Sequence, residues 1–90
     1  MLAEFLLYDN FIINKYHSIY LKLITKVINE NRIYNSSIHE YHHILPKSVN
    51  GTVTIPLTFK EHFIAHRLLT KFTKGKLKHS MIFAFRTFRN

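Results

Sequence analysis

The chain has 90 residues, of which 47% are hydrophobic and 14% aromatic, and its formal net charge is +8. This composition predicts one small packed domain and excludes a disordered segment. The absence of cysteine excludes a disulfide scaffold and a thiolate zinc site, and it fits a reducing intracellular compartment.

The positive charge is concentrated in the last third of the chain. Residues 60–90 hold eight Lys and Arg against one acidic residue, or +7, whereas residues 1–59 hold five against four, or +1. This polycation favours a polyanionic partner such as nucleic acid, although a solvated basic face has the same composition. Asp9 and Asn10 interrupt the first apolar run, so we expect no membrane segment and a soluble protein.

The first predicted element is an amphipathic helix. Apolar side chains recur at steps of three and four residues, with lysines on the other side. The apolar positions are Ile12, Tyr16, Ile19, Tyr20, Leu23, Ile24, Val27 and Ile28. Asp9 or Asn10 can cap its start, and the polar run that follows predicts an end near Asn31.

A β-hairpin follows in the prediction. Residues 37–45 are rich in β-branched and aromatic side chains and predict a strand that ends at Pro46. The sequence VNG at residues 49–51 is a strong turn signal, and residues 52–57 predict the second strand.

Two helices complete the chain. Thr58 and Glu61 form a capping box, and helical spacing continues from there to Gly75. Residues 76–89 predict a last helix, with Leu77, Met81, Ile82, Phe85 and Phe88 buried and Lys78, Arg86 and Arg89 outward. The order helix, hairpin, helix, helix is an α+β fold.

Four of the seven histidines form two close groups. His62 and His66 are four residues apart on a predicted helix, so their rings share one face and can hold one cation, although a surface pair without a ligand has the same spacing. His42 and His43 are neighbours on a predicted strand and point to opposite faces unless the strand bends before Pro46. With such a bend, one ring can bind a cation while the other takes a proton from water. For His17, His39 and His79 we expect partly buried rings bonded to backbone carbonyls.

These segments resemble a known family. The run YHHILPKS, a short connection, a second extended run, then LTFKEHFIAHRLLTKF and the later MIFAF are similar to the phage-type HNH endonucleases of the ββα-metal, or His-Me finger, group. The resemblance begins at about Tyr8 and is strongest over residues 41–72. It implies one nuclease-like domain over residues 1–90. An N-terminal helical part (1–35) and a C-terminal helix (76–90) would flank a ββα-metal core (37–73), which is a β-hairpin packed on a helix. The resemblance also implies that the protein acts in the cytoplasm of a phage-infected bacterial host.

The resemblance also implies roles for particular residues. His43 would be the general base that activates the attacking water, and His42 and His62 would bind one divalent metal ion. His66 would be a further ligand or a phosphate contact. The reaction would be hydrolysis of a DNA phosphodiester bond, leaving 5′ phosphate and 3′ hydroxyl ends. Mg, Mn, Zn and Ni all stay open as the metal.

One position departs from the family's pattern. The central asparagine of the family lies nine residues before the first helix histidine, where this chain has Val53. Asn50 is the asparagine nearby and is the candidate for the same catalytic role, in which its side-chain amide would brace the loop.

Seven cations near the histidines are candidate contacts to DNA phosphates, which fix register without reading sequence. They are Lys47, Lys60, Arg67, Lys71, Lys74, Lys76 and Lys78. Since this sequence stops at Asn90, we expect weak intrinsic sequence specificity or a protein partner that supplies it.

Two other functions fit the sequence. The first is a non-catalytic basic module that holds a structural metal at the histidine cluster and binds nucleic acid or an acidic protein. The second is an interaction protein whose first helix packs on a partner.

Overall fold

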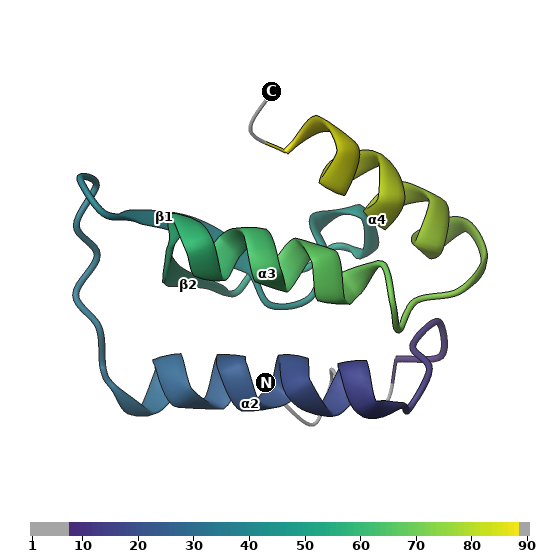
Figure 1. The fold of residues 1–90 in the computed structure, drawn as a ribbon, viewed down its shortest axis with the longest axis horizontal. Coiled ribbons are helices and arrows are strands. Elements are labelled where there is room, and N and C mark those ends of the chain that lie inside the picture. Colours follow the sequence, from purple (N-terminus) through teal and green to yellow (C-terminus); the bar gives the residue numbers. More distant parts are fainter. Residues whose placement is uncertain (1–7, 89–90) are drawn as a thin grey trace.

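The computed structural model describes residues 8–88. Its elements are α2 (Lys15–Asn29), β1 (His39–His43), the short 3-10 helix η1 (Lys47–Val49), β2 (Thr54–Thr58), α3 (Phe59–Leu69) and α4 (Gly75–Thr87). β1 and β2 pair as an antiparallel hairpin, which confirms the predicted α+β class and its β-β-α order. Figure 1 shows α2 and α3 side by side, the hairpin behind α3, and α4 on the side of α3 away from α2.

The hydrophobic core lies where α2, the hairpin and α3 meet. Tyr20 and Ile24 of α2, Leu57 of β2 and Leu69 of α3 are buried there. Phe72 follows α3 and is fully buried, with its ring centroid 5.2 Å from that of Tyr20. The apolar face of α2 is narrower than the sequence pattern predicted, because Ile12 lies before the helix and Ile19 is exposed.

α2 begins later than expected. Asn14 is its N-cap, with a side-chain oxygen that accepts a hydrogen bond from the backbone N–H of His17 at 3.0 Å, so the expected caps Asp9 and Asn10 were wrong. Asn14 Nδ2 also donates to the carbonyl of Lys71, at 3.0 Å. The cap therefore joins the start of α2 to the segment that follows α3. The helix ends at Asn29, two residues before the predicted end.

The hairpin strands are shorter than predicted. A turn precedes β1, in which the side-chain oxygen of Asn35 accepts from Ser37 N and its carbonyl accepts from His39 N. The strand therefore begins at His39 instead of residue 37. Strand pairing ends at His43 opposite Thr54, and residues 44–53 form a connection that contains η1. The predicted turn lies within it, where Asn50 has a φ of 67° in the left-handed region.

The capping box at Thr58 and Glu61 is confirmed, but the predicted end of α3 at Gly75 was wrong. The helix ends at Leu69 because the following backbone pairs with the segment before α2. Ile12 N donates to Phe72 O at 2.7 Å, and Phe11 forms an isolated β-bridge with Thr73.

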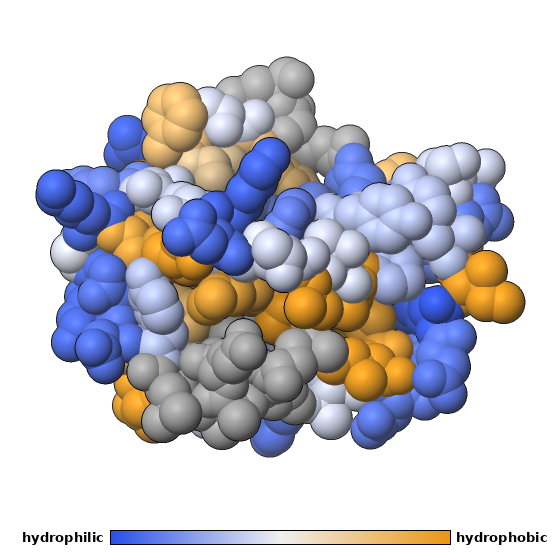
Figure 2. Space-filling model, turned by 180° about the vertical axis from the view of Figure 1, so that it is seen from behind, coloured by the Kyte–Doolittle hydropathy of each residue, from blue (hydrophilic) through white to orange (hydrophobic). Residues whose placement is uncertain are grey.

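α4 starts at Gly75, which has a φ of 63°, and ends at Thr87. Leu77 and Met81 are buried as expected. Phe85 and Phe88 are only half-buried, and Arg86 points outward. The expected outward position of Arg89 lies outside the described residues. Seen from behind, an apolar band crosses the middle of the surface between hydrophilic regions (Figure 2). Within residues 8–88, the helices are too short or too polar to cross a lipid bilayer.

Candidate metal centre

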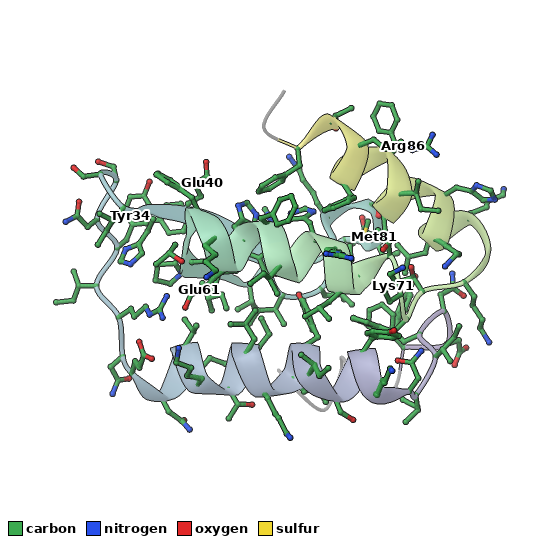
Figure 3. The ribbon with its side chains drawn as sticks, viewed as in Figure 1. Tyr34, Glu40, Glu61, Lys71, Met81 and Arg86 are labelled. Carbon is green, nitrogen blue, oxygen red and sulfur yellow. The ribbon has the colours of Figure 1, made fainter. Side chains whose placement is uncertain are left out.

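The register of the hairpin decides which β1 side chains face α3. His42 lies opposite Ile55 and Glu40 opposite Leu57, and both β2 residues are buried in the core. Cross-strand partners share a face, so Glu40 and His42 also point toward α3. Figure 3 shows Glu40 at the edge of the hairpin beside α3.

Three histidines converge between β1 and α3. His42 from β1 and His62 and His66 from α3 each offer a ring nitrogen, and these nitrogens all lie within 4.8 Å of one another. The Nε2 atoms of His62 and His66 are 3.0 Å apart. The structure thus brings together the three residues that the resemblance implied as metal ligands, although they are 20 or more residues apart in two of the three pairs.

Two of the three rings are held by hydrogen bonds from outside the cluster. The hydroxyl of Tyr20, which is buried, lies 2.6 Å from His42 Nε2 and donates to the carbonyl of Ile44 at 2.8 Å. Oε1 of Glu40 lies 2.9 Å from His62 Nδ1. Such partners orient ligand rings at metal sites.

Burial lowers the pKa of two of the clustered histidines. The pKa of His42 lies well below its usual value because the ring is buried, and the neighbouring His66 and His62 lower it further. Burial, and then the nearby His62, lowers the pKa of His66 to about 4. Both rings are therefore neutral at neutral pH, which is the form that binds a metal ion.

The histidines open into a hollow of about 370 Å³ between β1, α3 and α4. His43 lines this hollow together with His42, although the two alternate on the strand. β1 ends at His43 and the chain turns through Pro46 into η1, whose Lys47 also lines the hollow. Neutral imidazoles, a separate histidine and a cation therefore surround one space. This arrangement can hold a divalent ion beside a proton acceptor and a bound anion.

Phe88 covers the histidine pair of α3. Its ring centroid lies 4.9 Å from that of His62 and 5.0 Å from that of His66. The aromatic ring therefore packs against both histidine rings on one side. The sequence placed Phe88 in the core of the last helix and gave no sign of this contact.

The two candidates for the central asparagine position have different environments. Asn50 is exposed, caps the end of η1 and has left-handed backbone angles. It is not among the residues that line the histidine hollow. Val53 is 44% exposed, and its carbonyl accepts from Ile44 N at 3.1 Å, next to the end of β1.

The predicted DNA-contacting cations are distributed over several surfaces. Lys47 lines the histidine hollow, whereas Arg67 and Lys71 line a second hollow with Tyr16, between α3 and α2. Lys78 Nζ donates to the carbonyl of Thr70 at 2.7 Å, so it stabilises the end of α3. The expectation that Lys78 points outward was therefore wrong. The remaining three, Lys60, Lys74 and Lys76, are exposed.

The other histidines differ from one another. His17 is buried, with its ring 5.3 Å from that of Phe72. His39 is buried and accepts from the backbone N–H of Asn35 at 3.1 Å, a backbone partner as expected but an amide instead of a carbonyl. His79 is exposed, so the expectation of a partly buried ring was wrong there.

Sequence reasoning missed the residues that hold α3 in place. Arg32 makes a two-pronged contact with Glu61, with Nη1 to Oε1 at 2.5 Å and Nη2 to Oε2 at 2.7 Å, and it also donates to the carbonyl of Pro56. This contact clamps the start of α3 to the connection after α2. Glu40 lies two residues before His42, and this nearness to the paired histidines is the one local signal that pointed to it.

Two curated proteins of Enterobacteria phage T4 are similar to this chain. "Probable mobile endonuclease E" is 39% identical over 74 residues, which cover 78% of this chain and 49% of the relative. "Probable mobile endonuclease C" is 42% identical over 43 residues, which cover 43% of this chain and 20% of the relative. The chain thus spans about half the length of the first relative and about a fifth of the second. No protein-family model matches the chain, and no solved structure matches it at a comparable level of significance.

Proposed function

We propose that this chain carries the catalytic centre of a metal-dependent HNH endonuclease that hydrolyses DNA phosphodiester bonds. The observation that carries the proposal is the convergence of His42, His62 and His66 beside His43 in one hollow. The similarity to two T4 proteins named as probable mobile endonucleases supports the same reaction class.

The residues of the hollow have complementary tasks in this proposal. His43 accepts a proton from the water whose oxygen bonds to phosphorus, and the bond from phosphorus to the 3′ oxygen breaks. The departing 3′ oxygen takes a proton from solvent, which leaves a 5′ phosphate and a 3′ hydroxyl. Lys47 binds a phosphate oxygen at the edge of the hollow. Asn50, whose left-handed backbone ends η1, supports the loop that carries Lys47.

His42, His62 and His66 would hold the divalent cation, which supplies positive charge at the phosphate and at the departing oxygen. Three neutral imidazoles favour zinc or nickel in affinity, and magnesium or manganese bind them more weakly. Each of the three rings has a nitrogen within 4.8 Å of the others. The second nitrogen of His42 contacts Tyr20 and that of His62 contacts Glu40, so the donor set fits such an ion.

The exposed cations Lys60, Lys74 and Lys76, with Arg67 and Lys71 at the second hollow, would bind phosphates along the substrate. Contacts of this kind carry no base-specific information. We therefore propose weak intrinsic specificity, with any target preference supplied by a partner or by further protein sequence.

A plasmid-nicking assay tests the function. Supercoiled DNA is incubated with the protein and Mg, Mn, Ni or Zn, alongside the variants His43→Ala and His79→Ala. We expect metal-dependent nicking that His43→Ala abolishes and His79→Ala preserves, since His79 is an exposed histidine that does not line the hollow.

Three results would count against the enzyme. Cleavage that survives His43→Ala would show that His43 is not the general base. Nicking that needs no added metal and resists a chelator would show that the reaction does not use a cation. DNA binding without cleavage under any cation would support the non-catalytic module with a structural metal.

A further inference from the structure

The histidine cluster is surrounded by polar groups whose positions determine where the ring protons lie. A neutral imidazole carries one proton on one nitrogen, and the other nitrogen is the one that can bind a metal ion. The tautomer of each ring therefore decides whether a histidine in the right place can be a ligand.

The proton count at Tyr20 assigns the tautomer of His42. The Tyr20 hydroxyl has one hydrogen, and the carbonyl of Ile44 at 2.8 Å can only accept. If that hydrogen is donated to Ile44, then His42 Nε2, at 2.6 Å from the same oxygen, must carry its own proton and donate it. This arrangement satisfies both contacts, whereas donation from Tyr20 to His42 leaves the Ile44 carbonyl without that bond. His42 Nδ1 then holds the free lone pair.

Glu40 assigns the tautomer of His62 in a similar way. Its carboxylate oxygen lies 2.9 Å from His62 Nδ1 and, when ionised, can only accept. A neutral His62 therefore carries its proton on Nδ1 and leaves Nε2 as a lone pair, on the side that faces His66 at 3.0 Å.

We propose that Tyr20 and Glu40 are positioning residues that preset the tautomers of His42 and His62 for metal binding. The proposal rests on the metal site of the proposed function, but it concerns the metal-free protein as well. Neither residue would touch the cation or the substrate, and each acts through the histidine it contacts.

A consequence follows for His66. His62 Nε2 is an acceptor in this arrangement, so His66 must donate to it from its own Nε2 in the metal-free protein. Nδ1 of His66 is buried and has no hydrogen-bond partner among residues 8–88. To become a ligand through Nε2, His66 must move its proton to Nδ1. Two rings are therefore preset, and the third changes tautomer when a cation binds.

The test combines two measurements on the full chain. Nitrogen-15 NMR of the histidine rings reports each tautomer without metal at pH 7.5, and calorimetric titration with zinc reports affinity. Tyr20→Phe removes the hydroxyl and keeps the ring. Tyr16→Phe is the matched control, because Tyr16 lies on the same helix but lines the second hollow.

We expect His42 in the Nε2–H form, His62 in the Nδ1–H form and His66 in the Nε2–H form in the metal-free wild type. Tyr20→Phe should shift His42 toward the other tautomer and weaken zinc binding about 10- to 100-fold, as other outer partners of metal ligands do. Glu40→Ala should do the same through His62, and Tyr16→Phe should change neither reading.

Different failures are distinguishable. Wild-type His42 in the Nδ1–H form overturns the assignment, and so does a folded Tyr20→Phe with unchanged tautomer and unchanged zinc affinity. A wild type that shows the expected tautomers but binds no zinc, nickel or manganese overturns the positioning role together with the metal site. Zinc binding without nicking under any cation leaves the positioning role supported and counts against the nuclease alone.

Discussion

The Nε2 atoms of His62 and His66 lie 3.0 Å apart on successive turns of α3. Two ligand nitrogens on one tetrahedral cation lie about 3.3 Å apart when each is about 2.0 Å from it. A small rotation of either ring therefore suffices for the two to share an ion, and His42 from β1 is within reach as a third donor.

Zinc or nickel should stabilise the folded chain. At a free metal concentration 100 times the dissociation constant, the free energy of unfolding rises by about 2.7 kcal/mol. For a domain of this size that corresponds to a rise in Tm of roughly 10–20 °C. Thermal melts by circular dichroism at pH 7.5 measure it. His62→Ala should lose most of the shift and His79→Ala should keep it, and equal shifts in the two variants would contradict the site.

The metal-free protein should lose stability as the pH falls from about 6.5 to about 4. The pKa of His66 is lowered to about 4, so over this range the unfolded chain binds a proton that the folded chain does not. Burial lowers the pKa of His42 and of His17 in the same direction. Urea unfolding with a chelator at pH 4–8 gives the slope, and His66→Gln should reduce it. A flat profile would contradict the lowered pKa values.

The Arg32–Glu61 contact should contribute measurably to stability. Both side chains are largely buried, at 13% and 16% exposed, and two hydrogen bonds join them. Glu61→Gln should lower the free energy of unfolding by about 1–3 kcal/mol at pH 7. Glu30 also bonds to Arg32 but is 41% exposed, so Glu30→Gln is the matched control and should have a much smaller effect.

The same contact adds a second pH dependence. Arg32 is the main cause that lowers the pKa of Glu61 to about 2. The stabilising effect of the Arg32–Glu61 contact is therefore complete above about pH 4.5 and is lost as the pH falls toward 2. In urea unfolding of Glu61→Gln, the free energy of unfolding should not show this loss between about pH 4.5 and 2. An unchanged loss in the variant would assign it to other carboxylates.

Gly51 should be the more sensitive of the two glycines. A Cβ atom at Gly51 would overlap the carbonyl oxygen of Leu45, so the loop after β1 would have to move. Gly51→Ala should cost about 3 kcal/mol and weaken zinc binding. At Gly75 a Cβ meets open space but φ is 63°, so Gly75→Ala should cost about 1 kcal/mol and leave zinc binding unchanged. Equal effects on zinc affinity would contradict this difference.

Asn50 should act through its backbone. Glycine adopts the left-handed angles of Asn50 without strain, so Asn50→Gly should change stability by no more than about 0.5 kcal/mol and should keep plasmid nicking. Asn50→Ala should cost about 1 kcal/mol. Loss of nicking in a folded Asn50→Gly variant would instead assign the role to the side-chain amide.

The sequence determined the features that depend on local spacing. The order of helices and strands, the capping box at Thr58 and Glu61, and the shared helical face of His62 and His66 all follow from periods of 3.6 and 2 residues and from short-range hydrogen bonding. The structure confirms each of these. Local rules were less successful at element ends, because the N-cap Asn14 and the end of α3 at Leu69 depend on contacts with distant backbone.

Only the tertiary structure decided how the histidines are oriented. Tyr20 contacts His42, which is 22 residues later in the sequence, and Glu40 contacts His62, which is also 22 residues later. No local period encodes such a pair, because it exists only once α2, the hairpin and α3 have packed around a common core. The sequence alone thus indicated which residues could bind a metal ion. The packing of the chain selected which nitrogen of His42 and of His62 is free to do so.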